Sequence, residues 1–227
     1  MGRLIIYGDI HGCYQEFIDL RKKINPLEVD IETCVGDVIT RGKDSIKILR
    51  YIQKNNIRST IGNHENKIIR YLKHEKSGIK NPIKLDQDER KIISELSVSD
   101  VNFMNSMPLF IKFGRITVLH AGVQNHFNLD SLSKEEKSKV LRLRYISKNY
   151  NFIPFGEEDG DSVFWSEVYN GRQGLIVYGH QVFEKVKIDK HSLGIDTGCV
   201  YGNKLSAVVF SDTDNVEDYS IYSVNCK

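Results

Sequence analysis

The 227-residue sequence has little of what marks several large classes of protein. Its four cysteines, Cys13, Cys34, Cys199 and Cys226, show neither CxxC spacing nor the density of a disulfide framework, so a reducing compartment is expected. Only four prolines are present, and the apolar and charged fractions of 40% and 27% are those of an ordinary globular chain. The composition therefore argues against both a disulfide-rich secreted protein and a disordered one.

Long apolar runs and a large net charge are also lacking. No run approaches the ~20 residues that a membrane-spanning helix needs, and the first residues enter a strand-like segment without the basic and apolar regions of a signal peptide. The formal net charge of +2 argues against a strongly electrostatic role on nucleic acid or membrane surfaces. The sequence therefore predicts a cytoplasmic protein with a single domain over residues 1–227.

The first part of the chain alternates short apolar runs with amphipathic segments. This pattern predicts three strands, at 4–7, 31–36 and 57–61, separated by helices over 14–24 and 42–55. Such alternation is typical of α/β units whose strands are largely parallel and joined by right-handed crossovers. Functional sites in sheets of this kind form at the carboxyl ends of the strands.

The remainder of the chain changes character twice. Helical patterns at 66–75 and 88–107 predict a helical insert, over about 66–107, that packs on one side of the site, and a hairpin and a further helix are expected at 109–120 and near 133–146. Strand patterns then dominate, at 175–178, 186–188, 193–195, 205–210 and 219–222. A parallel half followed by an antiparallel half predicts an α/β fold of two sheets packed face to face, with helices outside.

Three of the early strands end in the same polar signature. Each runs into Gly-Asp or Gly-Asn, at Asp9, Asp37 and Asn63, with spacings of 28 and 26 residues. A single Gly-Asp at a strand end is more often a turn or a helix N-cap than a site. Two later strands also end in histidine, at His120 and His180. The joint occurrence at five strand ends favours a common site.

The residue types at these strand ends are those of a transition-metal centre. Carboxylate, amide oxygen and imidazole together suit Mn²⁺, Fe or Zn²⁺ better than Ca²⁺, and Mn²⁺ is the expected ion. Two ions need a shared ligand, and the carboxylate of Asp37, at the middle strand end, is the natural bridge. Two ions about 3.5–4 Å apart activate a bridging water for phosphoester hydrolysis. The candidate ligands are Asp9, His11, Asp37, Asn63, His120 and His180.

Two neighbours of these ligands fit the chemistry of a phosphoester. Arg41 follows Asp37 by four residues and can present a bidentate guanidinium to phosphate oxygens. His64 directly follows Asn63 and can protonate a leaving-group oxygen. Both residues are therefore candidates for substrate binding and catalysis.

These motifs together resemble the calcineurin-like metallophosphoesterases, and within them the phosphoprotein-phosphatase branch, which includes bacterial protein phosphatases and diadenosine tetraphosphatases. The resemblance covers residues 4–210 and rests on Gly8-Asp9-Ile10-His11-Gly12, Gly36-Asp37-Val38-Ile39-Thr40-Arg41-Gly42, Gly62-Asn63-His64-Glu65, His120-Ala121-Gly122, Gly179-His180 and the segment 195–202. It implies a four-layer αββα sandwich. It also implies Asp9, His11 and Asp37 on one ion and Asp37, Asn63, His120 and His180 on the other, with His64 as general acid and Arg41 as phosphate ligand.

One residue departs from the family pattern. Thr40 stands where the family usually has the Asp that pairs with the motif histidine. A threonine hydroxyl can orient an imidazole but cannot stabilise an imidazolium by charge. We therefore predict that His64 is a weaker acid here, which suits better leaving groups such as phosphoanhydrides and aryl phosphates.

Several further residues are open to two interpretations. The resemblance points to Arg142 or Arg144 as a second phosphate contact, although both are by default arginines on a helix face. Tyr145, Tyr150 and Trp165 could stack a base, yet aromatic residues at such spacing are more often core. Asp196 is expected to order a turn near the site.

The sequence thus predicts a two-metal phosphoesterase of phosphomonoesters or phosphoanhydrides, with phosphoproteins and dinucleoside polyphosphates as leading substrates. The alternative is a catalytically weakened, metal-binding scaffold protein, with Thr40 as a first sign of decay. All six ligand positions are intact, which argues against that alternative. A nucleic-acid-binding module is weakest, because Lys and Arg number 32 against 30 Asp and Glu.

Overall fold

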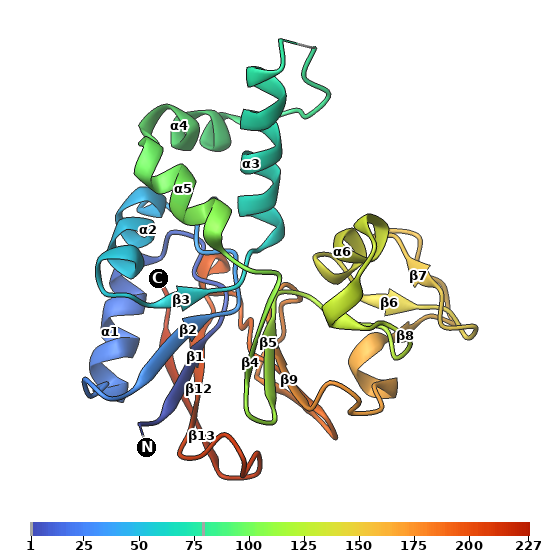
Figure 1. Ribbon diagram of the computed structural model, residues 1–227. Helices are drawn as coiled ribbons and strands as arrows, with labels where there is room; N and C mark the ends of the chain where they lie inside the picture. Colours follow the sequence, from blue (N-terminus) through green and yellow to red (C-terminus); the bar gives the residue numbers. More distant parts are fainter. Residues whose placement is uncertain (1, 79) are drawn as a thin grey trace.

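A computed structural model describes residues 2–78 and 80–227 and contains two five-stranded sheets packed face to face (Figure 1). The first sheet has the order β13-β12-β1-β2-β3, from strands Tyr219–Asn225, Lys204–Phe210, Leu4–Tyr7, Ile31–Cys34 and Arg58–Ser59. The second has the order β10-β11-β9-β5-β4, from strands Lys187–Asp189, Ser192–Gly194, Leu175–Tyr178, Ile116–Leu119 and Phe110–Phe113. The predicted α/β fold of two sheets packed face to face is confirmed.

Strand β1 lies at the centre of the first sheet, parallel to β2 and antiparallel to β12. Leu4 and Ile6 pack in the cluster between the two sheets, whereas Ile5 and Tyr7 pack with the helices on the outer face. Burial on both faces explains why the strand is a continuous apolar run and not an alternating one. The strand consequently delivers the residues that follow it to the interior of the molecule.

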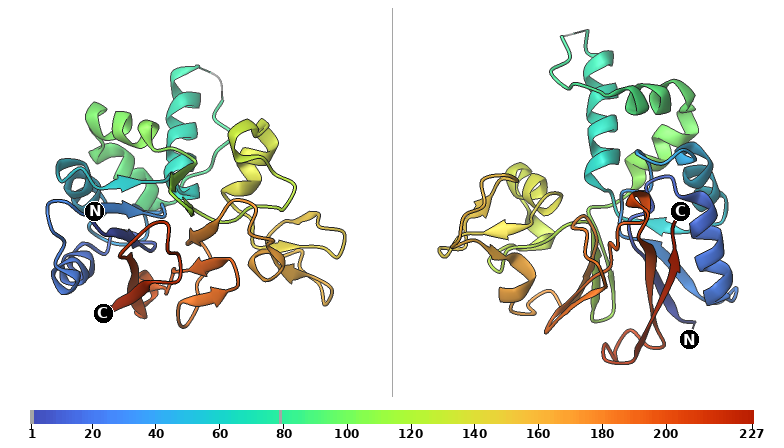
Figure 2. Two further views of the ribbon diagram at one scale, coloured as in Figure 1. Left: turned by 60° about the horizontal axis from the view of Figure 1, so that its bottom comes forward. Right: turned by 180° about the vertical axis from the view of Figure 1, so that it is seen from behind.

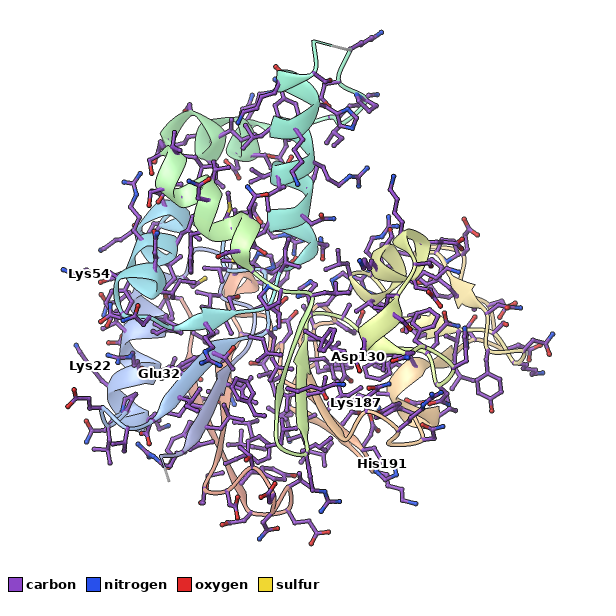
Figure 3. All side chains as sticks on the ribbon, viewed as in Figure 1. Lys22, Glu32, Lys54, Asp130, Lys187 and His191 are labelled. Atoms are coloured by element: carbon purple, nitrogen blue, oxygen red, sulfur yellow. A yellow bond between two sulfur atoms is a disulfide. The ribbon has the colours of Figure 1, made fainter. Side chains whose placement is uncertain are left out.

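Helices α1 (Tyr14–Ile24) and α2 (Ser45–Lys54) cover that outer face. The ring of Phe17 on α1 lies 4.8 Å, centroid to centroid, from that of Tyr7. Arg21 pairs with Glu32 of β2 at 2.8 Å, and Glu32 is labelled in Figure 3. These contacts fix α1 on the sheet, and the strand–helix–strand order that the sequence predicted is observed here.

The C-terminal strands differ from the expected arrangement. We expected a separate antiparallel half, but β12 and β13 join the first sheet, where Leu4 of β1 is opposite Phe210 of β12. In the second sheet β5, β9 and β11 are parallel, with β4 and β10 antiparallel at its edges. Both sheets are therefore mixed. The first sheet gains its antiparallel strands because the chain returns to it after completing the second (Figure 2).

Three helices follow β3. They are α3 (Asn63–Lys76), α4 (Gln87–Glu95) and α5 (Val98–Ser106). The helical pattern expected over 88–107 is present as two helices, because the chain is divided at Ser97, whose hydroxyl accepts from the Asp100 N–H and so caps a new helix. Helix α3 begins earlier than predicted, at Asn63, which places two candidate site residues in its first turn.

Residues 121–174, called here the covering layer, pack on the outer face of the second sheet. Leu119 and Tyr178 of that sheet share a buried cluster with Phe127 and Trp165 of the covering layer. The helix expected near 133–146 ends at Val140, as α6 (Lys134–Val140). Buried Leu141 and Leu143 alternate with two arginines, and this period of two leads into strand β6 (Tyr145–Ile146), which pairs with β7 (Phe152–Ile153) and β8 (Val163–Phe164).

One pair of cysteines is bonded. Cys199 forms a disulfide with Cys226, which the cysteine spacing did not predict, whereas Cys13 and Cys34 are free thiols. The bond ties the C-terminus to η3 (Cys199–Tyr201), a short 3-10 helix. Disulfides are rare in reducing compartments, so this pair runs against the expected redox environment.

None of the described helices is both long and apolar enough to cross a bilayer.

Candidate metal centre and phosphate pocket

The candidate residues of the sequence converge at the carboxyl ends of β1, β2, β5 and β9 and at the first turn of α3. Two glycines permit this convergence. A Cβ on Gly62 would collide with Asp37 Oδ1, and a Cβ on Gly179 would collide with Asp9 Oδ1. The Gly-Asn and Gly-His pairs therefore exist because the backbone must pass directly against a carboxylate.

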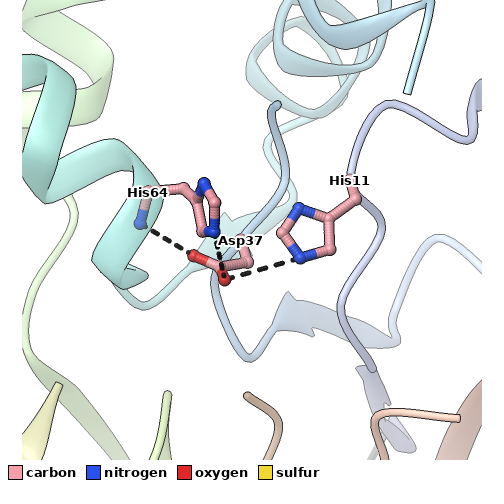
Figure 4. Close-up of side chains that lie close together, drawn as sticks. All are labelled: His11, Asp37 and His64. Carbon is pink, nitrogen blue, oxygen red and sulfur yellow. Dashed lines mark hydrogen bonds and ion pairs between the residues drawn. The ribbon is translucent and has the colours of Figure 1, made fainter. Parts of the chain in front are cut away.

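One group of possible ligands consists of His11, Asp37 and His64 (Figure 4). Asp37 Oδ2 lies 3.5 Å from His11 Nε2 and 3.9 Å from His64 Nε2, and Asp37 Oδ1 accepts from the His64 N–H at 3.1 Å. One ligand atom from each residue lies within 4.8 Å of the others, so the three could hold an ion. We expected His64 as an acid beside the site and not as a member of such a group.

A second group consists of Asp37, His120 and His180. His120 Nε2 lies 3.3 Å from Asp37 Oδ2 and 2.9 Å from Asn63 Oδ1. Its other nitrogen, Nδ1, lies 3.1 Å from the Val35 carbonyl oxygen. Asp37 belongs to both groups, which is the geometry required of a bridging carboxylate.

The hydrogen bonds test whether these residues fit a metal ion. A carbonyl oxygen accepts only from a protonated Nδ1, so in its neutral form the His120 ring turns the Nε2 lone pair toward two oxygen atoms. His180 Nε2 is buried and has no hydrogen-bond partner within residues 2–78 and 80–227. Lone pairs that point at one another with no proton between them repel, and a cation bound among them removes this repulsion. The donor set therefore fits divalent metal ions.

Asp9 lies apart from both groups. Its carboxylate accepts from the His180 N–H at 3.0 Å. Burial raises its pKa well above the usual range, and the charges of Asp196 and Asp37 raise it further. A cation would relieve this repulsion, which accords with the predicted role of Asp9 as a ligand.

Asp37 is the electrostatic centre of the site. Burial opposes its charge, yet the surrounding imidazoles of His120, His64 and His11 hold its pKa well below the usual range. In return, burial lowers the pKa of His11 to about 4 even though the charge of Asp37 opposes the shift. The pKa values of His64 and His180 are lowered too, chiefly by burial. Burial also acts to lower the pKa of His120, but the charge of Asp37 outweighs it and the net shift is upward. Metal binds the neutral form of an imidazole, which is the form that the lowered pKa values of the other three histidines favour.

Glu65 belongs to one of the sequence motifs but was given no role. It stabilises the backbone of the site. Its buried carboxylate accepts from the N–H groups of Asp37, Ile39 and Gly62, at 3.0, 3.1 and 3.0 Å. Burial raises the pKa of Glu65 to about 7, and the Asp37 charge adds to the effect. Glutamate at the third position of a helix is a capping signal, and that signal could have identified it.

The backbone around the site is strained. Of the eight non-glycine residues with positive φ among those described, five belong to the site, namely His11, Asp37, Thr40, Arg41 and His180. Such conformations cost about 1–3 kcal/mol each and persist where the surrounding structure enforces them. Thr40 has φ +74°, which is rare for a β-branched residue, and its N–H donates to Ser45 Oγ at 3.0 Å.

Thr40 contacts the residue that its family counterpart would contact. Its Oγ1 lies 2.7 Å from His64 Nδ1 and 3.4 Å from His11 Nδ1. The hydroxyl thus orients the His64 ring, as the sequence analysis expected, and brings no charge to it.

A cavity of about 680 Å³ opens over the metal-ligand groups. Arg41, Arg142 and Arg144 all line it. Arg41 contacts the Tyr201 hydroxyl, and Arg144 donates to Gln181 Oε1 at 2.8 Å and to the His180 carbonyl at 3.4 Å. Arg142 is held instead by Ser138 of α6, at 2.5 Å. Of the two candidates for a second phosphate contact, Arg144 is the one placed against the site.

Other expectations near the cavity have mixed outcomes. Asp196 lines the cavity and its Oδ1 accepts from the Gly198 N–H at 3.0 Å, so it does order a turn there. Trp165 is a core residue, with 1% of its surface exposed. Tyr150 is half exposed and does not line the cavity. No sequence motif marked four further residues that line the cavity, Phe152, Phe155, Gln181 and Val182.

Comparisons with known proteins identify the family of this chain. The family model described as calcineurin-like phosphoesterase matches residues 2–214. A bis(5'-nucleosyl)-tetraphosphatase PrpE [asymmetrical] from Bacillus velezensis is 30% identical over 93% of this chain and 90% of its own length. The protein of the same name from Bacillus subtilis is 29% identical over 93% of this chain and 92% of its own.

Solved structures show the same fold. A crystal structure of a protein assigned as a diadenosine tetraphosphatase superposes with a TM-score of 0.82 at 25% identity, covering 100% of this chain and 94% of that one. A Saccharomyces cerevisiae protein serine/threonine phosphatase superposes with a TM-score of 0.63 at 14% identity, covering 100% and 80% of the two chains. Because the family match spans nearly the whole sequence, this chain belongs to the calcineurin-like phosphoesterase family and is a hydrolase of phosphoesters, as its motifs predicted.

Proposed function

We propose that this chain hydrolyses dinucleoside polyphosphates in the cytoplasm, using two divalent ions for which Mn²⁺ is the best candidate. The observation that carries the substrate class is the pair of arginines, Arg41 and Arg144, that line one cavity with the candidate metal ligands, in addition to Arg142, which lines the same cavity but is held by Ser138. A single phosphate needs fewer cations than a chain of phosphates does, and guanidinium groups bind phosphate oxygens in pairs. Relatives that align over nine-tenths of this chain are named tetraphosphatases, which supports the same class.

The proposed ligands are Asp9, His11, Asp37, Asn63, His120 and His180. When bound, the two ions supply charge stabilisation of the phosphoryl group and activation of water. Arg41 and Arg144 bind the phosphate oxygens and hold the chain of phosphates across the cavity. Glu65 keeps the Asp37 loop in place through its three backbone hydrogen bonds.

His64 is the proposed proton donor to the leaving oxygen. Its Nδ1 faces Thr40 and its Nε2 faces the cavity and Asp37. Because the Thr40 hydroxyl carries no charge, it orients the ring without stabilising the imidazolium. A phosphoanhydride oxygen is a good leaving group that needs little protonation, so this site favours anhydrides over alkyl phosphates.

A substrate comparison tests the proposal. Full-length protein loaded with Mn²⁺ is offered a dinucleoside tetraphosphate, a phosphoserine peptide and an aryl phosphate, with Asp37→Asn as the control. We expect the highest kcat/KM on the tetraphosphate, and two products of unequal phosphate number by chromatography. A higher kcat/KM on the phosphopeptide would instead favour a protein phosphatase, and no metal-dependent turnover of any substrate would favour the scaffold alternative.

A further inference from the structure

A second cavity, of about 340 Å³, adjoins the phosphate pocket. It is lined by Tyr145, Phe155, Glu158, Asp159, Ser162 and Gln181, and two of these residues, Phe155 and Gln181, also line the phosphate pocket. An aromatic ring and an amide therefore form the boundary between the two cavities. Apart from Gln181, the lining residues of the second cavity belong to the covering layer, and four of them lie in the loop that joins β7 to β8, two strands labelled in Figure 1.

The ring of Phe155 is placed for stacking. It is 79% exposed, and its centroid lies 4.8 Å from the guanidinium carbon of Arg144. A single exposed apolar side chain is ordinary on a protein surface, but this one stands beside a guanidinium assigned to phosphate. A ligand that has phosphate on Arg144 would therefore bring its next group against the Phe155 ring.

The loop that carries Phe155 also presents an unused acceptor. Glu158 Oε1 is buried and has no hydrogen-bond partner among the described residues, whereas Oε2 accepts from the Gly156 N–H at 2.8 Å. A hydrogen bond within the loop, from Ser162 Oγ to Asp159 Oδ1 at 2.9 Å, stabilises its conformation. A buried carboxylate oxygen repels phosphate and calls for a hydrogen-bond donor, which an N–H group can supply.

A flat ring that carries an N–H donor and is attached to phosphate is an aminated nucleobase. We propose, on the basis of the function proposed above, that the second cavity binds one base of the substrate. The base stacks on Phe155, and its exocyclic amino group donates to Glu158. Adenine, guanine and cytosine carry that group. Uracil offers only its ring N3–H, which is flanked by two carbonyl oxygens that the Glu158 carboxylate repels, so the site discriminates against uridine nucleotides.

Inhibition of aryl phosphate hydrolysis tests this site without requiring a dinucleotide substrate. Ki values of ADP, UDP and pyrophosphate are measured with the Mn²⁺-loaded full-length protein. In the wild type we expect ADP to bind more tightly than UDP, and UDP more tightly than pyrophosphate. Phe155→Ala is expected to raise the Ki of ADP about 5- to 100-fold, the range of one base–aromatic stack, and to leave that of pyrophosphate unchanged. Phe155→Trp should retain tight ADP binding.

The acceptor is tested separately. Glu158→Ala is expected to raise the Ki of ADP to that of UDP and to leave the Ki of UDP unchanged. Glu157→Ala and Tyr150→Ala are matched controls, because these neighbours line neither cavity. Neither control should change any Ki. Equal loss of ADP and UDP binding in Glu158→Ala would overturn the assignment of the amino group.

The outcomes separate this inference from the proposed function. Suppose the wild type hydrolyses no dinucleoside tetraphosphate, yet its ADP inhibition depends on Phe155. The proposed substrate is then wrong and the base site stands. An equal Ki for ADP and pyrophosphate in the wild type, or an ADP Ki unaffected by Phe155→Ala, overturns the base site whatever the substrate is.

Discussion

The two walls of the phosphate pocket differ in burial, in backbone strain and in hydrogen bonding. One wall, called the metal-bearing wall after the ligands proposed above, is formed by the strand ends at Asp9, Asp37, Asn63, His120 and His180. It is largely buried, strained and interlocked by hydrogen bonds. The wall from the covering layer carries Arg144 and Phe155 on short strands and loops, and its side chains are partly exposed. Chemistry requires a rigid arrangement, whereas recognition of a particular substrate can rest on a variable surface.

The comparison predicts that the largest losses arise on the metal-bearing wall. Asp37→Asn removes the charge shared by both ligand groups, so kcat with Mn²⁺ should fall by about 10³-fold or more. The measurement is steady-state hydrolysis of an aryl phosphate with Mn²⁺ saturation checked by titration. A fall below about tenfold would mean that Asp37 is not the bridging ligand.

The second-largest effect is expected for Glu65, which holds the Asp37 loop in place. Glu65→Gln replaces a carboxylate that accepts three backbone N–H groups, so it should cost about 1–3 kcal/mol of unfolding free energy and lower Mn²⁺ affinity about 10- to 100-fold. Urea unfolding and metal titration measure the two effects.

Glu89→Gln is the matched control for Glu65. Glu89 is also a buried capping glutamate, and it accepts from the Asp86 N–H at 3.0 Å and pairs with Lys67 at 2.7 Å, whereas it shares no hydrogen bond with the Asp37 loop. We expect it to lower stability with no change in Mn²⁺ affinity. If both variants lose metal alike, Glu65 has no specific role in positioning Asp37.

The covering layer is expected to affect substrate binding more than metal binding. Arg144→Ala should lower kcat/KM about 10- to 100-fold, the value of a charge-assisted hydrogen bond to phosphate, with Mn²⁺ affinity unchanged. Arg142→Ala, two residues away and held by Ser138, should have a smaller effect. A reversed order would mean that Arg142 turns from α6 to bind the phosphate.

The smallest expected effect concerns Thr40. Thr40→Asp adds a charge beside His64 Nδ1, so kcat/KM on an alkyl phosphate should rise a few-fold relative to that on an aryl phosphate. Thr40→Val, which keeps the shape and removes the hydroxyl, should lower both rates. No selective gain on the poorer leaving group would refute the idea that Thr40 limits His64 as an acid.

The metal-bearing wall could be predicted from sequence because its constraints are local. A strand, a glycine forced by close approach and a ligand follow one another in three to five residues, as at Gly62 and Asn63. Glu65 was missed as a functional residue because its three partners include Asp37 and Ile39, which lie 28 and 26 positions away.

The covering layer was predictable only in part. Its alternating Leu141–Ile146 segment was interpreted as helix, since short segments of either period contain similar residues. The positions of Phe155 and Arg144 depend on the packing of three two-residue strands, which carry almost no periodic signal. The pairing of β12 with β1 in the first sheet likewise depends on tertiary contacts, which no local sequence pattern specifies.

The most direct measurement is anomalous X-ray diffraction from crystals of the full-length protein soaked in Mn²⁺. We predict two anomalous peaks, one on each side of the Asp37 carboxylate. The first should lie beside His11 and the second beside Asn63, His120 and His180. A single peak, or peaks that do not contact Asp37, would contradict this prediction.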